Sequence, residues 1–346
     1  MMGVFLRRVV VFFVLLVIGL MLSGCSGRSS LLIDKVDTVT GNPEDANDTG
    51  HDPGFEPDVG QDSTASCVSP DRPEVDQKPW TVGSANTLDV LTWNIRQFPT
   101  NSTTTSKVAD LIWQMGVDLV AVQEIADIDA FHELLCALPG YEGVLSTDQY
   151  STGEYQKTGY IYRSSQITVR AITPVFTSDN SAFPRPPLKA DIDVHLPDGA
   201  QTQFTIIDVH LKAGVSVDDA ARRRDAVVKL KGLVDGLVLA TPGSKVMIVG
   251  DFNDSPDDSA GENVFTAFLD DSSHYTVLTL ALAQADDYSY IPYPSLIDNM
   301  IVTSTLLSDT AGGYTEVLLL DEEITQYNYE NQVSDHRPVV TILPLQ

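Results

Sequence analysis

The sequence predicts an α/β sandwich, in which helices cover the outer faces of two β-sheets. Between residues 80 and 346 it contains nine short runs with the composition of β-strands and three helical stretches. The strands come in groups instead of alternating strictly with helices, so a doubly wound parallel sheet is not expected. No internal repeat is evident, and the length fits one domain with a sizeable core.

The predicted strands are short runs rich in β-branched, aromatic and aliphatic residues, bounded by turn residues. In chain order they are Leu88–Trp93, Leu119–Gln123, Gly159–Tyr162, Val169–Pro174, Leu188–Val194, Phe204–His210, Val246–Asp251, Ile297–Thr303 and Val339–Leu343. Helices are predicted over Ser106–Met115, Asp127–Leu138 and Asp218–Leu239. In the first helix Ser106 is the expected cap, and Val108, Leu111, Ile112 and Met115 have helical spacing.

The first 25 residues have the pattern of a bacterial lipoprotein signal peptide. Two arginines precede an apolar run over residues 9–20, and Leu22-Ser23-Gly24-Cys25 follows as a lipobox. The run is short for a membrane span, although an uncleaved membrane helix is the alternative. We therefore expect Cys25 to be lipidated, and the chain to be an exported lipoprotein anchored at the outer membrane or cell surface.

Residues 26–79 are rich in Asp, Gly, Pro, Ser and Thr and have no periodicity, which predicts a disordered acidic linker before a domain over residues 80–346. Cys67 precedes the domain and Cys136 falls on a predicted helix. An oxidising compartment would permit a disulfide between them, but two separate thiols fit the sequence equally well.

The chain is strongly acidic, with a formal net charge of −27, and residues 81–346 alone carry 36 acidic and 15 basic side chains. This balance argues against tight, non-specific binding to nucleic acid, which requires a basic face. It is compatible with a divalent cation at a phosphate-binding site, because a bound metal reverses the local field. The one basic run, Arg222–Arg224, is expected to form a solvated helix face with neighbouring aspartates.

Polar residues follow several of the apolar runs, at or near predicted strand ends. They are Asn94, Glu124, His210, Asp251 with Asn253, Asp298 with Asn299, and the segment Ser334-Asp335-His336-Arg337-Pro338. Any one of them alone is more simply explained as a cap or turn residue. Their occurrence together is the informative observation.

In this order the segments W-N, Q-E, H-L, G-D-F-N, I-D and S-D-H-R-P resemble the DNase I-like endonuclease/exonuclease/phosphatase superfamily. The resemblance covers Leu88 to Leu343, nearly all of the predicted domain. It implies a four-layer α/β/β/α sandwich with the active site at one end, between the two sheets. It also implies metal-dependent hydrolysis of a phosphate ester.

By this resemblance Glu124 is the first metal ligand, completed by Asn94 and Asp335. These oxygen donors suit Mg²⁺, with Mn²⁺ or Ca²⁺ as alternatives. His336 is expected to be the general base, and Asp298 to accept a hydrogen bond from its imidazole.

The resemblance makes Asp251 and Asn253 residues that orient the attacking water or leaving group and contact a phosphate oxygen. His210 resembles a second histidine that contacts the phosphate and protonates the leaving oxygen; which histidine is base and which is acid stays open. Arg185 resembles an arginine that approaches the phosphate, although an exposed loop arginine is an equal alternative.

Two positions depart from the family pattern. Asn299 stands where many members carry His or Arg, and the match around Tyr155-Gln156-Lys157 is ambiguous, so that Glu154 is the available partner for His210 or there is none.

The favoured function is a surface-anchored, monomeric DNase I-like endonuclease whose substrate is nucleic acid. A phospholipid phosphodiesterase of the sphingomyelinase type is the alternative, supported by the predicted anchor and by the aromatic segment Tyr288–Tyr293. An inositol-phosphate phosphatase and a non-catalytic surface-binding module are further alternatives.

Overall fold

The computed structural model describes residues 71–72, 77–148, 156–259, 261–310 and 313–345. The predicted signal peptide, Cys25, Cys67 and most of the predicted linker lie outside the described residues, so the expectations about them stay predictions. Among the described residues, no helix is both long and apolar enough to cross a membrane.

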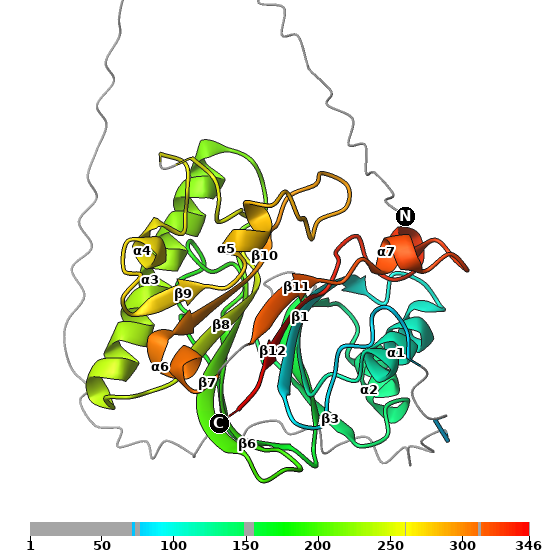
Figure 1. The fold of residues 1–346 in the computed structure, drawn as a ribbon. Helices are drawn as coiled ribbons and strands as arrows, with labels where there is room; N and C mark the ends of the chain where they lie inside the picture. The colour runs from blue at the N-terminus through cyan, green and yellow to red at the C-terminus, as the bar shows by residue number, and fades with distance from the viewer. Residues whose placement is uncertain (1–70, 73–76, 149–155, 260, 311–312, 346) are drawn as a thin grey trace, which may run out of the picture. The chain divides into compact units, whose positions relative to one another are not determined.

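The described part of the domain contains two six-stranded sheets that face each other (Figure 1). The first has the order β11-β12-β1-β2-β4-β3, formed by Tyr314–Val317, Val339–Leu343, Leu88–Phe98, Leu119–Ile125, Lys157–Arg163 and Tyr141–Leu145. The second has the order β5-β6-β7-β8-β10-β9, formed by Ile167–Pro174, Leu188–His195, Gln201–His210, Val246–Asp251, Asp298–Thr303 and Tyr275–Val277. Both sheets are mixed, because β1 pairs in parallel with β2 and β7 with β8, while their other pairings are antiparallel.

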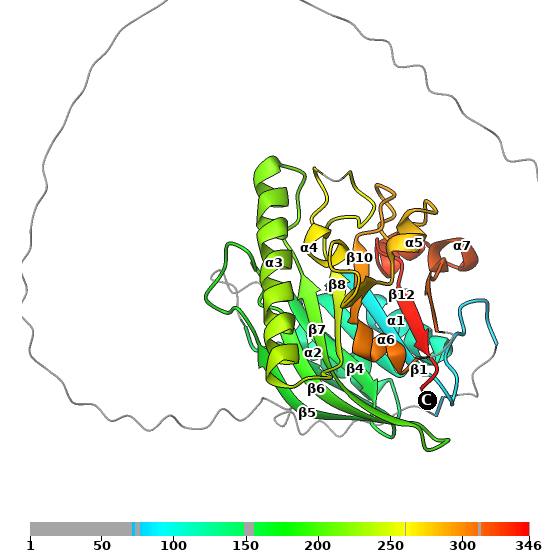
Figure 2. The ribbon, with the colours of Figure 1, turned by 60° about the vertical axis from the view of Figure 1, so that its left-hand side comes forward.

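Helices cover the outer face of each sheet. The helices α1 (Thr104–Met115) and α2 (Ile128–Cys136) pack on the first sheet, and α3 (Val217–Ala240) and α4 (Thr266–Leu269) pack on the second (Figures 1 and 2). Four further helices are a single turn or little more, and they lie in the connections: α5 (Leu280–Ala283), α6 (Ser304–Ser308), α7 (Leu320–Glu323) and α8 (Tyr329–Gln332). The four-layer α/β/β/α sandwich expected from the sequence is confirmed.

Three hydrophobic cores separate the four layers, and the alternation of side chains along each strand explains them. In β1, Val90 points into the core between the sheets, whereas its neighbours Leu91 and Trp93 point toward α1 and α2. In β8, Val249 lies in the middle core and Ile248 faces α3. Both faces of the central strands are thus buried, which explains why these runs are almost entirely apolar.

The predicted helices α2 and α3 begin where their capping residues indicate. The side chain of Asp127 accepts a hydrogen bond from the Ala130 amide, and Ser216 forms a reciprocal capping box with Asp219 before α3. The cap predicted for α1 is wrong: the helix begins at Thr104, so Ser106 lies inside it and its hydroxyl donates to the Thr103 carbonyl.

The strand predictions miss three short strands, β3, β9 and β11, each at or next to the edge of its sheet. The placement of Asn94 at the end of the first strand is also wrong, because β1 continues to Phe98. The ladder between β1 and β2 is interrupted between Asn94 and Phe98, where Arg96 and Gln97 have left-handed φ values of 38° and 43°. The strand therefore continues beyond Asn94 through a bulge, which single-residue propensity does not reveal.

The basic run on α3 does not form the solvated face expected of it. Arg223 is buried, and its guanidinium donates to Asp254 at 2.8 Å and to the carbonyls of Lys212 and Gly214. Arg222 and Arg224 also donate to carbonyl groups of neighbouring loops. The three arginines therefore hydrogen-bond α3 to the loops around it; Arg223 is buried, and Arg222 and Arg224 are partly exposed.

Cys136, the last residue of α2, is disulfide-bonded. The alternative of two separate thiols is therefore wrong for Cys136. Cys67 lies outside the described residues, so a disulfide between these two cysteines stays the other alternative left by the sequence.

Two buried carboxyl groups lie together where β1 and β2 begin. The amide of Asp89 donates to the Asp118 carboxylate at 3.1 Å, and Arg163 lies 3.5 Å from the same carboxylate. Burial raises the pKa of Asp89 to about 6; burial, together with the nearby charge of Asp89, raises the pKa of Asp118 to about 7. The folded state therefore favours the protonated acids, which in an unfolded chain would ionise near pH 4.

This pair predicts a pH-dependent gain in stability for Asp118→Asn. The stabilising contribution of the protonated pair is complete below about pH 4 and is lost as the pH rises through about 6 to 7. A neutral amide does not ionise, so the variant keeps the stability that the parent loses at high pH. At pH 8 its melting temperature should lie about 2–4 °C above that of the parent, which corresponds to about 1 kcal/mol in a domain of this size. At pH 5 the gain should be smaller. Thermal melts at both pH values measure it, with the exposed Asp270→Asn as the control; an equal gain at both pH values would contradict the prediction.

Candidate active site

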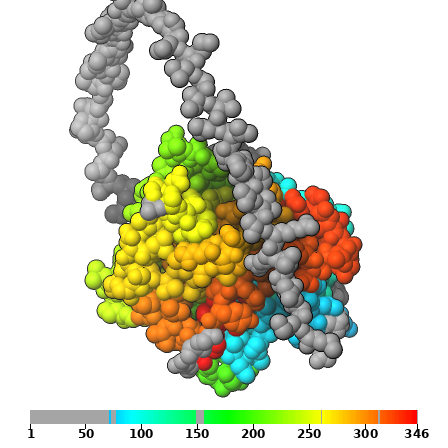
Figure 3. All heavy atoms as spheres, turned by 45° about the horizontal axis from the view of Figure 1, so that its top comes forward, coloured from blue at the N-terminus to red at the C-terminus, as the bar shows by residue number. Residues whose placement is uncertain are grey.

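The predicted site residues gather at one end of the sandwich, where strands of both sheets finish or begin. In the first sheet, Asn94 lies beside Gln123, the residue before Glu124. In the second sheet, Asp251 lies between His210 on one side and Asp298 on the other. Figure 3 brings this end forward and shows segments of residues 250–300 in yellow and orange beside those of about 315–335 in red-orange.

A histidine and a carboxylate from opposite sheets form a buried, hydrogen-bonded pair in the site. His336 precedes β12, and its Nδ1 donates to Asp298 Oδ2 of β10 at 2.7 Å. The backbone carbonyl of His336 accepts hydrogen bonds from the Trp93 indole at 3.2 Å and from the Tyr329 hydroxyl at 2.7 Å. Burial alone would lower the pKa of His336, but the hydrogen bond and negative charge of Asp298, with neighbouring carboxylates, raise it to about 10.

Asn94, Glu124 and Asp251 form a second group at the same end of the sheets. The Asn94 amide nitrogen donates to Asp251 Oδ2 at 3.0 Å and to Glu124 Oε1 at 3.3 Å. Burial and the charge of Asp298 raise the pKa of Asp251 to about 7, against the opposing effect of His336. Two carboxylates from two sheets are thus held by one amide, which places their oxygens around a common point.

The backbone at Glu124 directs its carboxylate into this group. Glu124 has a φ of 64°, a left-handed value that is uncommon for a non-glycine residue, and the ladder between β2 and β4 shifts register between Val122 and Ile125. Its Oε2 accepts a hydrogen bond from the amide of Gln97 at 2.9 Å. A backbone in this region costs about 1–3 kcal/mol and is typical of functional sites.

His210 completes the group from β7. Its Nε2 lies 3.6 Å from Asp251 Oδ2 and 3.8 Å from Glu124 Oε1, and its buried Nδ1 has no hydrogen-bond partner among the described residues. Burial lowers the pKa of His210, and the positive charges of Arg185 and His336 lower it further. His210 is therefore neutral at pH 7, whereas His336 is charged.

Arg185 and Asn253 lie next to His210, at the loop that leaves β7. Arg185 donates from Nε to the Gln156 side chain at 3.0 Å and from a terminal nitrogen to the Leu211 carbonyl at 3.2 Å. Asn253, with a φ of 53°, donates to the same carbonyl at 3.3 Å, and its amide donates to Asp251 at 2.8 Å. Both side chains are thus part of the site's rim. Glu154 lies outside the described residues.

Asn299 does not reach the site. Its side chain accepts from Thr279 and donates to the carbonyls of Asp254 and Leu296, on the other face of β10 from Asp298. The departure from the family pattern at this position therefore has a structural role here.

Several residues that support the site carry no signal of their own in the sequence. The Ser334 hydroxyl donates to the Asn94 carbonyl at 2.6 Å and accepts from the His336 amide, and the Ser289 hydroxyl accepts from the Asp298 amide at 3.0 Å. Arg337 is buried and donates to Asp321, Glu322 and the Tyr288 hydroxyl. Ser334 and Arg337 belong to the recognised S-D-H-R-P segment, whereas only the three-dimensional structure identifies Ser289.

The acidic groups fit a divalent cation in two ways. Asp251, Asp298 and His336 offer ligand atoms that all lie within 4.8 Å of one another, and Asp298 Oδ1 is buried without a hydrogen-bond partner among the described residues. However, His336 Nδ1 is occupied by its hydrogen bond to Asp298. The carboxylates of Glu124 and Asp251 provide the oxygen donors that Mg²⁺ prefers without breaking that bond.

The two other ligands expected from the sequence are engaged by protein groups. The side-chain oxygen Oδ1 of Asn94 accepts from the Arg96 backbone amide at 3.0 Å. Asp335 lies 3.4 Å from the Arg96 guanidinium and 4.0 Å from His336 Nε2. Asn94 therefore directly orients the two carboxylates, and Asp335 faces the histidine.

Residues 91–336 match the model of the endonuclease/exonuclease/phosphatase family. A comparison with curated protein sequences finds no match.

Solved structures with the same fold cover most of the chain. The human Nocturnin catalytic domain with bound sulfate is 16% identical, with a TM-score of 0.54, and the match covers 77% of this chain and 97% of that one. A mannosyl-6-phosphatase of Bacteroides thetaiotaomicron is 14% identical, with a TM-score of 0.53 and coverage of 74% and 99%. TDP2 of D. rerio complexed with a single-stranded DNA product is 13% identical, with a TM-score of 0.51 and coverage of 74% and 98%. At these identities the similarity establishes the fold.

Proposed function

Because the chain belongs to the endonuclease/exonuclease/phosphatase family, we propose that it is a metal-dependent phosphodiesterase whose substrate is nucleic acid. One observation carries the proposal: the His336–Asp298 pair, Asp251, Glu124 and His210 converge from both sheets on one end of the sandwich. The family consists of phosphoesterases, and this group of side chains has the chemistry that phosphodiester hydrolysis requires.

The two histidines have opposite protonation states at neutral pH. His336 is charged because its pKa is raised to about 10, and its free Nε2 donates a hydrogen bond to a phosphate oxygen or a proton to the leaving oxygen. His210 is neutral because its pKa is lowered, and it accepts a proton from water. In this proposal His336 is the acid and His210 the base, which is the reverse of the role expected for His336 from the sequence. Environments that separate the pKa values of two groups are a common basis for pairing an acid with a base.

The proposed cation is Mg²⁺, held by Glu124 and Asp251 with Asp335 nearby. When bound, it neutralises charge on the phosphate oxygens and so stabilises the transition state. Asn94 keeps the two carboxylates in place through its hydrogen bonds of 3.3 and 3.0 Å. Arg185, fixed by Gln156 beside His210, supplies a guanidinium for the substrate phosphate.

An aromatic pair beside His336 supports nucleic acid as the substrate. The Tyr290 ring lies 5.0 Å from the imidazole and 6.4 Å from the Tyr293 ring, and Tyr293 is 77% exposed. Exposed aromatic rings at the edge of such a site stack on unpaired bases. The similarity to TDP2, whose solved complex contains a single-stranded DNA product, is consistent with this choice.

The same tyrosines and the predicted lipid anchor support phospholipid as a second candidate substrate, since tyrosine also lies readily in a membrane interface. The full-length protein should release soluble nucleotides from single-stranded DNA faster than from duplex DNA, because stacking requires free bases. Release of head groups from sphingomyelin vesicles should stay at background. Both assays are run with Mg²⁺ and with a chelator, which should abolish activity. Head-group release with no cleavage of DNA would exclude the nuclease and favour the second candidate.

A further inference from the structure

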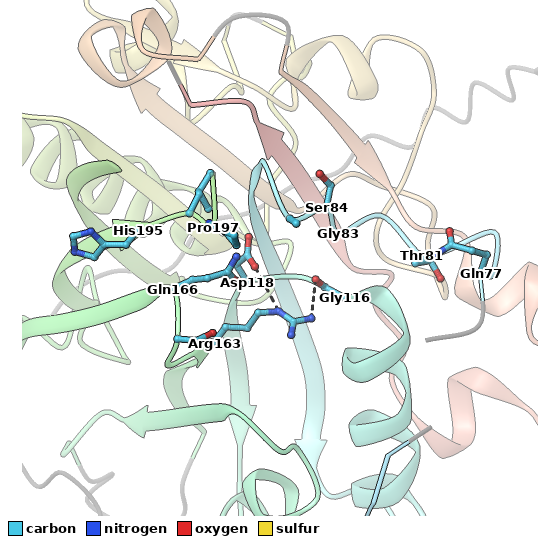
Figure 4. A pocket seen from close by; sticks show the side chains of 13 residues that line it. Gln77, Thr81, Gly83, Ser84, Gly116, Asp118, Arg163, Gln166, His195 and Pro197 are labelled. Atoms are coloured by element: carbon cyan, nitrogen blue, oxygen red, sulfur yellow. Dashed lines mark hydrogen bonds and ion pairs between the residues drawn. The ribbon is translucent and has the colours of Figure 1, made fainter. Parts of the chain in front are cut away.

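A second pocket lies between the two sheets at the end opposite to the candidate active site. It has a volume of about 610 Å³ and is lined by residues that precede β1 and β2 and by the turns that follow β4 and β6 (Figure 4). The catalytic groups lie at the far ends of these same strands. Asp89 and Asn94 are five residues apart on β1, about 16 Å at the rise of a strand. The pocket is therefore separate from the proposed catalytic site, although its size suits a small molecule.

The floor of the pocket contains an unsatisfied acceptor. Gln166, in the turn between β4 and β5, is only 9% exposed, and its Oε1 is buried with no hydrogen-bond partner among the described residues. Figure 4 shows its side chain directed toward Asp118, inside the ring of lining residues. A buried amide oxygen without a donor costs about 1–3 kcal/mol, so a ligand that donates a hydrogen bond there gains by satisfying it.

The one cationic side chain of known position in the pocket wall is already engaged. Arg163 lies 3.5 Å from Asp118 Oδ1, donates to the Gly116 carbonyl at 3.0 Å, and stacks on the Tyr141 ring with its guanidinium carbon 4.7 Å from the ring centre. An anionic ligand would have to compete with Asp118 for this arginine. The wall is therefore poorly suited to an anion.

The balance of charge in and behind the wall is negative. Asp118 lines the pocket, and Asp89 lies directly behind it, joined through its amide, so two carboxyl groups face one guanidinium. His195 lies on the opposite wall, at the end of β6, and is exposed.

We propose that this pocket binds a small organic amine, whose ammonium group donates hydrogen bonds to Gln166 Oε1 and to the Asp118 carboxylate. The ammonium group supplies both the missing donor and the missing positive charge. Ala85, Leu196 and Pro197 line the remainder of the pocket and accommodate a short alkyl chain. Because Asp118 and Arg163 belong to the first sheet and Gln166 and His195 flank strands of the second, the bound amine would connect the two sheets.

Isothermal titration of putrescine into the full-length chain tests the proposal. The buffer is held at pH 8, where Asp118, with its pKa raised to about 7, is ionised. It contains 0.15 M salt, which limits the Debye length to about 8 Å and suppresses non-specific attraction to an acidic protein. Wild type should show one saturable site. Asp118→Asn and Gln166→Met should each weaken the affinity about tenfold or more, because one removes the charge and the other the acceptor. Thermal melts of both variants exclude unfolding as the cause of weaker binding. The melting temperature of Asp118→Asn should be at least that of wild type.

A matched variant separates this pocket from the acidic catalytic end. Glu124→Gln removes a carboxylate there and should leave putrescine binding unchanged. Loss of binding in Glu124→Gln with retention in Asp118→Asn would place the amine at the catalytic end and overturn the proposal. No saturable binding to wild type, or stronger binding of inorganic phosphate that depends on Arg163, would overturn it as well. Since binding is measured without substrate, the result is independent of the proposed phosphodiesterase activity.

Discussion

Replacing His336 by alanine is expected to lower kcat for phosphodiester hydrolysis by about 10²–10⁴-fold, the usual contribution of a general acid or base. The imidazole is held by a 2.7 Å hydrogen bond to Asp298, so its Nε2 is presented to the substrate in one orientation and one protonation state. Steady-state kinetics at pH 7 on single-stranded DNA measure the loss. KM should change less than kcat, because the proton is transferred only in the transition state.

Asp298→Asn tests whether the pair acts as a unit. An amide accepts the Nδ1 hydrogen bond without supplying the charge that keeps His336 protonated, so kcat should fall and the double variant should be little worse than His336→Ala. His274→Ala, in which an exposed histidine hydrogen-bonded to Asp271 is removed, is the control and should keep full activity. Full activity in His336→Ala would remove this histidine from the mechanism.

Glu124→Gln is expected to have the second large effect, a loss of about 10²–10³-fold in kcat that excess Mg²⁺ does not fully restore. The substitution keeps the size of the side chain, and its one carbonyl oxygen still accepts from either the Gln97 amide or Asn94, which in the parent donate to different oxygens. It removes the negative charge that attracts the cation, so titration calorimetry should show weaker Mg²⁺ binding, by at least about tenfold.

The exposed Glu133→Gln on α2 makes the same chemical change far from the site and should bind Mg²⁺ like wild type. Should Glu124→Gln keep both its activity and its metal affinity while a chelator still abolishes hydrolysis, the cation would be held by Asp251, Asp298 and His336 instead. That outcome would make His336 a metal ligand instead of a proton donor and would revise the mechanism.

The central strands of the fold could be predicted because both of their faces are buried. Runs such as Val246–Asp251 contain little besides aliphatic residues, and a polar residue after such a run marks the end of the sheet. The strands β3, β9 and β11 are edge strands of 5, 3 and 4 residues, and such short runs carry too little alternation for local composition to reveal them. Ser106 was wrong as a cap because the helix begins two residues earlier, after Thr103, whose side chain makes no capping hydrogen bond that a sequence pattern would indicate.

The sequence predicted which residues lie in the candidate site better than it predicted their contacts. The sequence motifs selected Asn94, Glu124, Asp298 and His336, and the structure places all four at one end of the sandwich. It could not show that Asn94 would donate to two carboxylates, because that depends on where β8 lies relative to β1. The prediction that Arg223 lies on a solvated helix face was wrong for a similar reason. Its neighbours in sequence are acidic, but its hydrogen-bond partners come from loops that only the fold brings near.

The hydrogen bond between His336 and Asp298 joins residues carried by opposite sheets, and the apolar middle core packs those sheets against each other. Side chains such as Val90 and Met247, which touch no reacting group, consequently set the alignment of the catalytic groups. A displacement of about 1 Å between the sheets would leave each sheet intact and yet separate proton donor from acceptor. Catalytic activity should therefore respond to small changes in the relative position of the two sheets. Mild denaturant should abolish activity at a lower concentration than the one that unfolds the strands.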